Sequence, residues 1–373
     1  MALSGSTCLT GSCDLPTRQS GVFFLTDFSP NTTDRAATVS SAGERELINR
    51  IRARAGTTAA APWITLGIGD DASVMAVPRG EVLVSSVDAL VEDVHFRLDW
   101  STPESVGRKA IAVSLSDLAA MGAVPRAVLV SLTLPAAFPL ADFDALVNGL
   151  VEEAVRHGAT LAGGNIATSP GGLAIHVTSL GSAHPRRILT RAGGRPGDEL
   201  FVTGTIGAAT AGLGALRQAG SAGARDIASL ADCLARYETP VPLLRCGHRV
   251  AGQRAASACM DLSDGLADAV RQVAQASGTG ACLDAALLPV HPDALRWFES
   301  AGLDPVTAAL SGGEDYELLF AVPRRRRRGF FAAISRSGGI SATRIGELTT
   351  APALVLRQSD HNTVLPAGYS HLG

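Results

Sequence analysis

The chain has 373 residues, of which 46% are hydrophobic and 5% aromatic, and its formal net charge is −3. A chain of this length exceeds one ordinary hydrophobic core and is typical of two domains of roughly 150 residues each. The mild acidity gives no basic field for a nucleic-acid partner, and the five arginines at 324–328 have no interleaved aromatics. No apolar run reaches the ~18 residues of a membrane span, so we expect no membrane association.

The six cysteines (Cys8, Cys13, Cys233, Cys246, Cys259 and Cys282) show neither a C-x-x-C pair nor a spacing typical of metal ligands. Scattered cysteines of this kind predict reduced thiols in a cytoplasmic protein. Lys109 is the only lysine in the chain, so any phosphate-binding lysine has to be this residue.

Residues 1–42 are rich in Ser, Thr, Gly and Ala without periodicity, and we interpret them as a disordered extension. A helix is expected to begin at Gly43-Glu44. The first half then predicts strands at 64–68, 74–77, 82–87, 127–134, 159–163 and 173–180, with helices at 103–121 and 140–157.

Residues 181–198 are dense in Pro, Gly and Arg and look like a connection between halves. The second half predicts a strand at 199–203, a small-residue helix after Gly207, helices at 226–236, 241–252 and 264–276, and strands at 281–284, 317–322 and 341–346. We expect one domain over 43–182 and a second over 183–373. The shared order of strand, acidic turn and helix suggests a pseudo-symmetric α+β architecture with the site in the interdomain cleft.

Aspartates recur in pairs or at short spacings in apolar, glycine-containing segments. They lie in Gly67-Ile68-Gly69-Asp70-Asp71, Ser85-Ser86-Val87-Asp88, Ser116-Asp117 and Asp261-Leu262-Ser263-Asp264-Gly265. Neighbouring carboxylates repel, and two that share a site do not both ionise without a compensating charge. A fold that gathers several of them beside strand ends is suited to a hard cation such as Mg²⁺. The pattern favours phosphate chemistry.

Taken singly, most of these segments have a simpler interpretation. An Asp pair after glycine is typical of a turn or a helix cap, and Gly163-Gly164-Asn165 reads equally well as an ordinary loop or as a close backbone approach to a ligand. Asp117 is different, because it lies in an otherwise apolar helical segment where an unpaired carboxylate would be costly. We expect Asp117 to face a partner or a metal ion.

Several common catalytic motifs are missing. The chain has no G-x-x-x-x-G-K-[ST] P-loop, no kinase-type glycine-rich loop with its H-R-D partner, and no G-x-S-x-G elbow. A protein of this kind that uses ATP must hold it mainly with metal ions and backbone amides.

As an ordered set, the segments resemble the thiamine-monophosphate kinase family of the aminoimidazole-ribonucleotide-synthetase-like (PurM-like) superfamily. The resemblance rests on the acidic segments above and on Val94-His95-Phe96, the block from Lys109 to Gly122, Gly163-Gly164-Asn165, Leu189-Thr190-Arg191-Ala192-Gly193, Gly312-Gly313-Glu314-Asp315-Tyr316-Glu317 and Gly368-Tyr369-Ser370-His371. It implies a two-domain PurM-like α+β fold, a homodimer, and ATP-dependent conversion of thiamine monophosphate to thiamine diphosphate.

The resemblance also implies site residues. Several Mg²⁺ ions would be held by the oxygen ligands Asp70, Asp71, Ser86, Val87 (through its carbonyl), Asp88, Asp117, Asn165, Asp261 and Asp264. ATP would contact Gly164, Asn165, Arg191 and Ser263, with Arg191 stabilising phosphate charge, and thiamine monophosphate would contact His95, Glu314 and Tyr369. No residue is expected to act as an acid or base, since the acceptor is itself an anionic phosphate.

Three departures from the family pattern stand out: Val87 replaces a frequent Thr, Asn165 replaces a common Asp, and Pro366-Ala367 replaces an aromatic before the terminal Gly-Tyr. Two alternatives stay open. One is another ATP-dependent synthetase of the superfamily; a selenophosphate synthetase would need a reactive Cys just before the first strands, whereas Cys8 and Cys13 lie far upstream. The other is a non-catalytic nucleotide-binding maturation or regulatory protein, against which the nearly intact acidic set argues.

Overall fold

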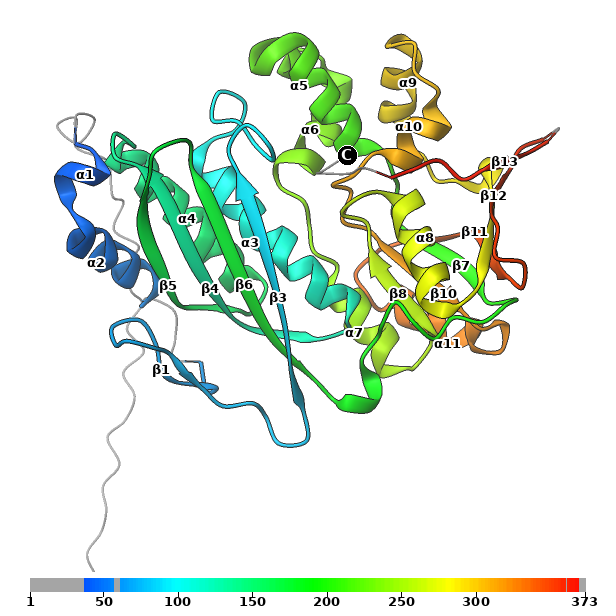
Figure 1. The fold of residues 1–373 in the computed structure, drawn as a ribbon, viewed down its shortest axis with the longest axis horizontal. Coiled ribbons are helices and arrows are strands. Elements are labelled where there is room, and N and C mark those ends of the chain that lie inside the picture. The colour runs from blue at the N-terminus through cyan, green and yellow to red at the C-terminus, as the bar shows by residue number, and fades with distance from the viewer. Residues whose placement is uncertain (1–36, 57–60, 360, 369–373) are drawn as a thin grey trace, which may run out of the picture.

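The computed structural model describes residues 37–56, 61–359 and 361–368. They form two halves, each built on a sheet (Figure 1). The strands are β1 (Ile64–Leu66), β2 (Val74–Met75), β3 (Val82–Val91), β4 (Val124–Pro135), β5 (Thr160–Ser169), β6 (Ala174–Ala183), β7 (Glu199–Thr203), β8 (Ala258–Asp261), β9 (Gly280–Asp284), β10 (Leu318–Val322), β11 (Ala342–Thr349), β12 (Leu354–Arg357) and β13 (Asn362–Val364). The helices are α1 (Val39–Ala42), α2 (Glu44–Ala55), α3 (Pro103–Ala120), α4 (Leu140–Arg156), α5 (Ala208–Arg225), α6 (Ala231–Glu238), α7 (Leu244–Gly252), α8 (Leu266–Ser277), α9 (Pro292–Ser300), α10 (Pro305–Ser311) and α11 (Arg327–Ser335).

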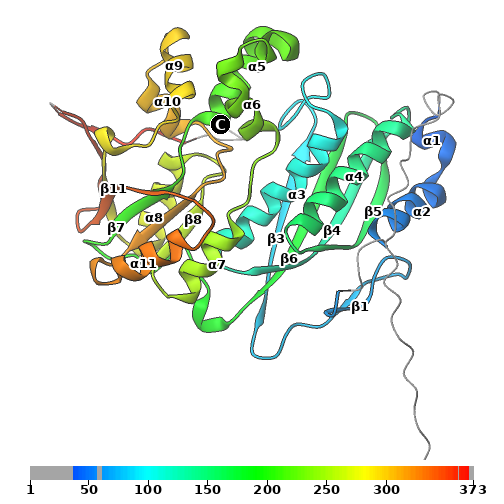
Figure 2. The same cartoon turned by 180° about the vertical axis from the view of Figure 1, so that it is seen from behind.

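The first half is a four-stranded sheet of order β3-β6-β4-β5 with α3 and α4 packed on one face. Figure 2 shows these two helices in front of the sheet, and Figure 1 shows the opposite face without a covering helix. Helix α3 begins where the sequence predicts, because Thr102 accepts a hydrogen bond from the Ser105 amide and Pro103 occupies the first turn. It is buried on nearly every side, since α4, α7 and both sheets surround it.

The second half is a seven-stranded sheet of order β13-β12-β9-β11-β7-β10-β8. Its interior strand β7, between β11 and β10, is buried on both faces. Leu200 and Val202 join a core shared with α5, α6 and α8, whereas Phe201 points the other way into a core shared with α7, α11 and α3. That second core continues without a break into the first half, so the two halves are joined by packed apolar side chains.

Most expected elements are confirmed, including the helix at 103–120 and the strand at 199–203. Two expectations were wrong. The disordered extension expected over 1–42 is contradicted at residues 39–42, which form α1, because Thr38 caps this turn and its backbone bridges to Pro139; residues 1–36 lie outside the described residues. The glycines at 163–164 do not begin a loop, because β5 runs on to Ser169, paired with β4 across a bulge. Strand β8 was not anticipated, nor were α9, α10, β12 and β13.

The crossing of α3 and α4 depends on glycine. A Cβ on Gly149 would lie 2.0 Å from the carbonyl oxygen of Glu104, a backbone atom that cannot rotate away. We expect Gly149→Ala to lower the free energy of unfolding by about 1–3 kcal/mol, the usual cost of overpacking. Gly329→Ala in α11 is the matched control, because a Cβ there meets no atom of the described chain within 4 Å. It should stabilise slightly, by up to about 1 kcal/mol. Equal effects in urea denaturation would contradict the close crossing.

Candidate active site

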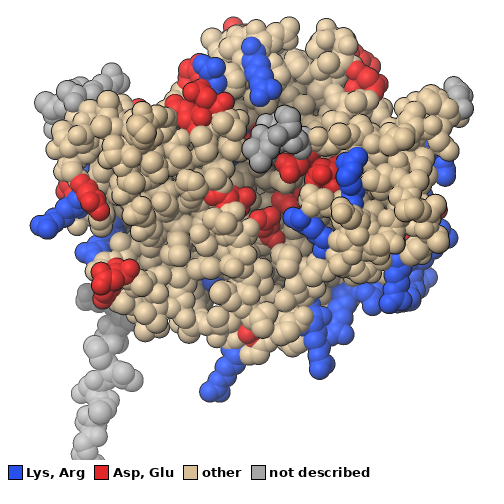
Figure 3. Space-filling model, in the orientation of Figure 1, with Lys and Arg blue, Asp and Glu red and all other residues tan. Residues whose placement is uncertain are grey.

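Carboxylates from both halves meet where α3 passes between the sheets. Ser86 and Asp88 lie on the inward face of β3, Asp117 lies on α3, and Asp261 ends β8. The Ser86 hydroxyl donates to Asp117 Oδ2, and the buried Ser116 hydroxyl donates to Asp261 Oδ2 at 2.7 Å. We call Asp88, Asp117 and Asp261 the acidic centre. Figure 3 shows acidic side chains gathered near the middle of this face, where the halves meet.

The acidic centre carries more negative charge than its protein surroundings compensate. Burial, together with the charge of Asp117, raises the pKa of Asp88 to about 6. Burial and the charges of Asp117 and Asp88 raise the pKa of Asp261 to about 7, against the opposing effects of Ser116 and Arg191. Both carboxyls therefore hold their protons to a higher pH than an ordinary aspartate, as expected for like charges that share a poorly solvated site.

Three further groups lie within electrostatic reach of this centre. Arg191 stabilises the charged form of Asp261, and its guanidinium donates to Gln272 at 2.5 Å. Asp264 follows in the same loop as Asp261, and the Tyr316 hydroxyl has a pKa raised by burial and by Glu314, Asp261, Asp88 and Asp264. Arg191 and Asp264 are among the predicted site residues; Tyr316 is not, although it lies inside the Gly312–Glu317 motif.

The Gly312–Glu317 segment mainly organises the second half. Asp315 accepts from the amides of Gly207 (2.7 Å) and Ala209 (3.2 Å) at the start of α5. Glu317 accepts from the Thr203 hydroxyl at 2.6 Å and pairs with Arg236 at 2.7 Å. Of the three acids in this segment, Glu314 alone is directed toward the first half. Its own amide donates to the Ser263 carbonyl at 2.7 Å, which joins the segment to the Asp261–Gly265 loop.

Lys109 connects the predicted substrate residues His95 and Glu314. Its ammonium lies 2.9 Å from Glu314 Oε1, donates to the His95 carbonyl at 3.1 Å, and lies 3.8 Å from the centre of the Tyr237 ring. Lys109 is 2% exposed. The only lysine of the chain is therefore buried in an ion pair and is not presented to a phosphate, which the sequence could not show.

Other predicted residues lie apart from the acidic centre. Asp70, Asp71, Gly164 and Asn165 border a cavity of about 940 Å³ in the first half, which Arg52 also lines. Strands β5 and β3 are opposite edges of the four-stranded sheet, so Asn165 and Asp88 lie on strands roughly 14 Å apart. Within one chain these residues do not converge on the acidic centre.

The remaining predicted residues have mixed outcomes. The Val87 side chain is 66% exposed on the outer face of β3, so only its backbone could serve a metal ion. His95 is half-buried, and its Nδ1 accepts from the Val91 amide at 3.1 Å. Ser263 offers its backbone carbonyl to Glu314. Tyr369 lies outside the described residues.

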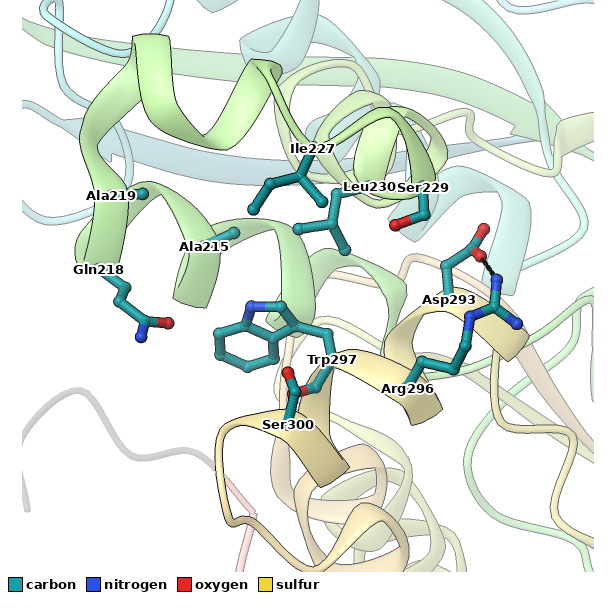
Figure 4. Close-up of a pocket in the computed structure, with 10 residues that line it drawn as sticks. All are labelled: Ala215, Gln218, Ala219, Ile227, Ser229, Leu230, Asp293, Arg296, Trp297 and Ser300. Atoms are coloured by element: carbon teal, nitrogen blue, oxygen red, sulfur yellow. Dashed lines mark hydrogen bonds and ion pairs between the residues drawn. The ribbon is translucent and has the colours of Figure 1, made fainter.

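A second cavity of about 420 Å³ lies between α5 and α9 around Trp297 (Figure 4). Asp293, which lines this cavity, also belongs to a group with Asp232 and His291, whose possible ligand atoms lie within 4.8 Å of one another. These groups already serve local structure, because Asp293 pairs with Arg296 and His291 Nδ1 accepts from the Asp293 amide at the start of α9. None of the described helices is both long and apolar enough to cross a membrane.

The acidic centre fits a divalent cation. Asp88 Oδ2 is buried and has no hydrogen-bond partner among the described residues, an arrangement that is costly unless a ligand satisfies it. The possible ligand atoms of the acidic centre are carboxylate and hydroxyl oxygens, which Mg²⁺ prefers to nitrogen or sulfur.

Comparisons with known proteins agree with this arrangement. Residues 69–183 match the family model "AIR synthase related protein, N-terminal domain", and residues 195–358 match the corresponding C-terminal domain. The thiamine-monophosphate kinase of Escherichia coli is 36% identical over 83% of this chain and 92% of its own. That of Mycobacterium tuberculosis is 40% identical over 69% of this chain and 74% of its own.

The chain belongs to the thiamine-monophosphate kinase family.

Solved structures extend the family likeness to three dimensions. The thiamine-monophosphate kinase of Stenotrophomonas maltophilia has a TM-score of 0.73 at 34% identity, over 83% of this chain and 95% of its own. A structure described as AaThiL complexed with AMPPCP and TMP has a TM-score of 0.70 at 28% identity, over 92% and 100% of the two chains. The hydrogenase maturation protein HypE, at 18% identity and a TM-score of 0.71, shares the fold alone. The two-domain PurM-like α+β fold is thereby confirmed.

The acidic centre predicts a specific response to Mg²⁺. We expect Mg²⁺ to stabilise the wild-type protein, by about 2.7 kcal/mol at a concentration near 100 times its Kd. Asp117→Asn should lose most of this effect yet be at least as stable without metal, because one repelling charge is gone. Thermal unfolding with and without Mg²⁺ measures both quantities.

Asp226→Asn, an exposed substitution after α5, is the matched control and should respond to Mg²⁺ like the wild type. Equal stabilisation of Asp117→Asn and the wild type by Mg²⁺ would refute the metal assignment.

Proposed function

We propose that this protein transfers the γ-phosphoryl group of ATP to thiamine monophosphate, giving thiamine diphosphate and ADP, with Mg²⁺ as the metal. The observation that carries this proposal is the acidic centre: three carboxylates from both halves, one with an unpartnered buried oxygen. Relatives named thiamine-monophosphate kinase and the AaThiL complex with AMPPCP and TMP support the choice of substrates.

In this proposal the metal ligands come from the acidic centre and from residues around it. Asp88, Asp117 and Asp261 hold Mg²⁺, with Ser86, Asp264 and the Val87 carbonyl beside them, while Asp70, Asp71 and Asn165 belong to the separate cavity near Gly164. Bound Mg²⁺ would screen the phosphate charges and stabilise the charge that develops during transfer. Asn165 supplies an amide oxygen where a carboxylate is common, so it would hold a metal less strongly.

The reaction needs little from reactive side chains, because the attacking group is already an anionic phosphate. The main obstacle is the approach of two polyanions, so positioning and charge stabilisation account for the rate. Arg191 stands beside Asp261 and can grip phosphate oxygens through two N–H groups. Ser263 and Gly164 would contact ATP, whereas His95, Glu314 and Tyr369 would contact thiamine monophosphate. Direct in-line transfer requires no covalent enzyme intermediate.

The function is tested by ADP release in a coupled assay at millimolar Mg²⁺. Release should depend on thiamine monophosphate, and Asp117→Asn should lower kcat by at least about 100-fold, because charge stabilisation is the main catalytic term. ADP release at a rate that does not depend on thiamine monophosphate would contradict the assignment. It would favour another ATP-dependent synthetase, whereas nucleotide binding without turnover would favour a maturation or regulatory role.

We also propose a homodimer in the cytoplasm. On the outer face of β3, Leu83 is 56% and Val87 66% exposed, and no described helix covers this side of the sheet. Exposed apolar stripes on an open sheet are typical of protein interfaces. The described cysteines Cys233, Cys246, Cys259 and Cys282 are free thiols, as a reducing compartment favours.

The outer face can be tested by charge insertion. Leu83→Glu should shift the protein from dimer to monomer in analytical ultracentrifugation, because a carboxylate would be buried without a partner. Val364→Glu, at an 82% exposed position of the other half, is the control and should leave the mass unchanged. A monomeric wild type, or a Leu83→Glu dimer of unchanged affinity, would contradict the interface.

A further inference from the structure

Lys109 occupies a junction of four segments that are distant in the chain. It extends from α3 to the carbonyl of His95 (3.1 Å), to Glu314 in the loop before β10 (2.9 Å), and to the ring of Tyr237 in α6 (3.8 Å). The Tyr237 hydroxyl donates to the same His95 carbonyl at 3.1 Å. The buried ammonium is thus held by a carboxylate, a carbonyl and an aromatic face.

A buried ammonium is stable only when its charge and its donors are compensated. At Lys109 the Glu314 carboxylate provides the charge, and the Tyr237 ring adds a cation–π contact. These contacts also remove Lys109 as a phosphate ligand, because its ammonium is occupied and its side chain is 3% exposed. The role of the lysine must therefore be exerted through its partners.

Glu314 is the partner that faces the site. Its side chain is 22% exposed, and the nearest approach of the Lys109 ammonium is to Oε1; no hydrogen bond to Oε2 is found among the described residues. The backbone of Glu314 has φ 66°, a left-handed conformation that non-glycine residues rarely adopt, and its amide is fixed by the Ser263 carbonyl. One carboxylate oxygen is therefore anchored, and the other is accessible from a fixed direction.

We propose that Lys109 is a positioning residue, which orients Glu314 so that Oε2 accepts a hydrogen bond from an amino group on the heteroaromatic part of the substrate. This inference rests on the proposed function, in which Glu314 contacts thiamine monophosphate. Because Lys109 neutralises the carboxylate, Glu314 is a weak counter-ion for the cationic thiazolium ring. Its Oε2 instead accepts a hydrogen bond from a neutral N–H donor on the pyrimidine ring. Lys109 also fixes the His95 loop through its carbonyl, so both substrate contacts depend on one ammonium.

The proposal is tested by steady-state kinetics with each substrate varied in turn. Lys109→Met keeps the length of the side chain but removes the ammonium. It should raise KM for thiamine monophosphate about tenfold or more while KM for ATP stays within about twofold. Arg108→Met is the matched control on the same helix, because Arg108 pairs with Glu104 and Glu152 and not with Glu314. It should change neither constant.

A double-mutant cycle separates positioning from simple loss of stability. Glu314→Gln alone should also raise KM for thiamine monophosphate, and Lys109→Met combined with Glu314→Gln should be no worse than Lys109→Met alone, because the two residues act as a unit. Should Lys109→Met fail to fold, Tyr237→Leu provides the second variant. It removes the ring beside the ammonium together with the hydroxyl that donates to the His95 carbonyl, and it should raise the same KM by about threefold.

The outcomes distinguish a failure of the positioning role from a failure of the proposed function. The positioning role is overturned if the wild type is active and folded Lys109→Met has an unchanged KM for thiamine monophosphate. Fully additive effects of the two substitutions in the double-mutant cycle overturn it as well. Equal increases in both KM values together with a lower Tm indicate a structural role and overturn it as well. If the wild type shows no turnover, or turnover that does not depend on thiamine monophosphate, the proposed function is overturned, and this inference with it.

Discussion

Repulsion among buried carboxylates is the constraint on which the site depends. Asp88, Asp117 and Asp261 reach the interior from separate segments, and burial with mutual repulsion raises the pKa values of Asp88 and Asp261. Such an arrangement lowers the stability of the protein without a cation, and hydroxyls from Ser86 and Ser116 offset only part of that cost. Such a site is suited to a divalent ion, whose charge would compensate the carboxylates.

Helix α3 holds the whole arrangement in place. It carries Asp117 and Ser116 toward the acidic centre and Lys109 toward Glu314. Because α3 is packed in a core continuous between the two sheets, a displacement of either half would disturb both groups at once. Its glycine-dependent crossing with α4 and its contacts with α7 keep that position fixed. In the proposed function, one rigid element thus supports both metal binding and substrate orientation.

The sequence predicted local structure where its signals were strong. Apolar positions at helical spacing between Pro103 and Gly122 predicted the helix now seen as α3, and the strand expected at 199–203 is β7. It failed at β8, because Ala258–Asp261 is a four-residue strand without alternation or β-branched residues. It also could not separate the Asp70–Asp71 cavity from the acidic centre, nor pair Lys109 with Glu314. Those relations come from strand order and helix packing over long chain separations.

We expect the two halves to share one divalent ion site at Asp88, Asp117 and Asp261. Anomalous diffraction from crystals grown with Mn²⁺ and a non-hydrolysable ATP analogue tests this site most directly. An anomalous peak is expected within bonding distance of carboxylate oxygens from Asp117 and from at least one of the other two. Peaks confined to Asp70 and Asp71, with none among these three carboxylates, would contradict it.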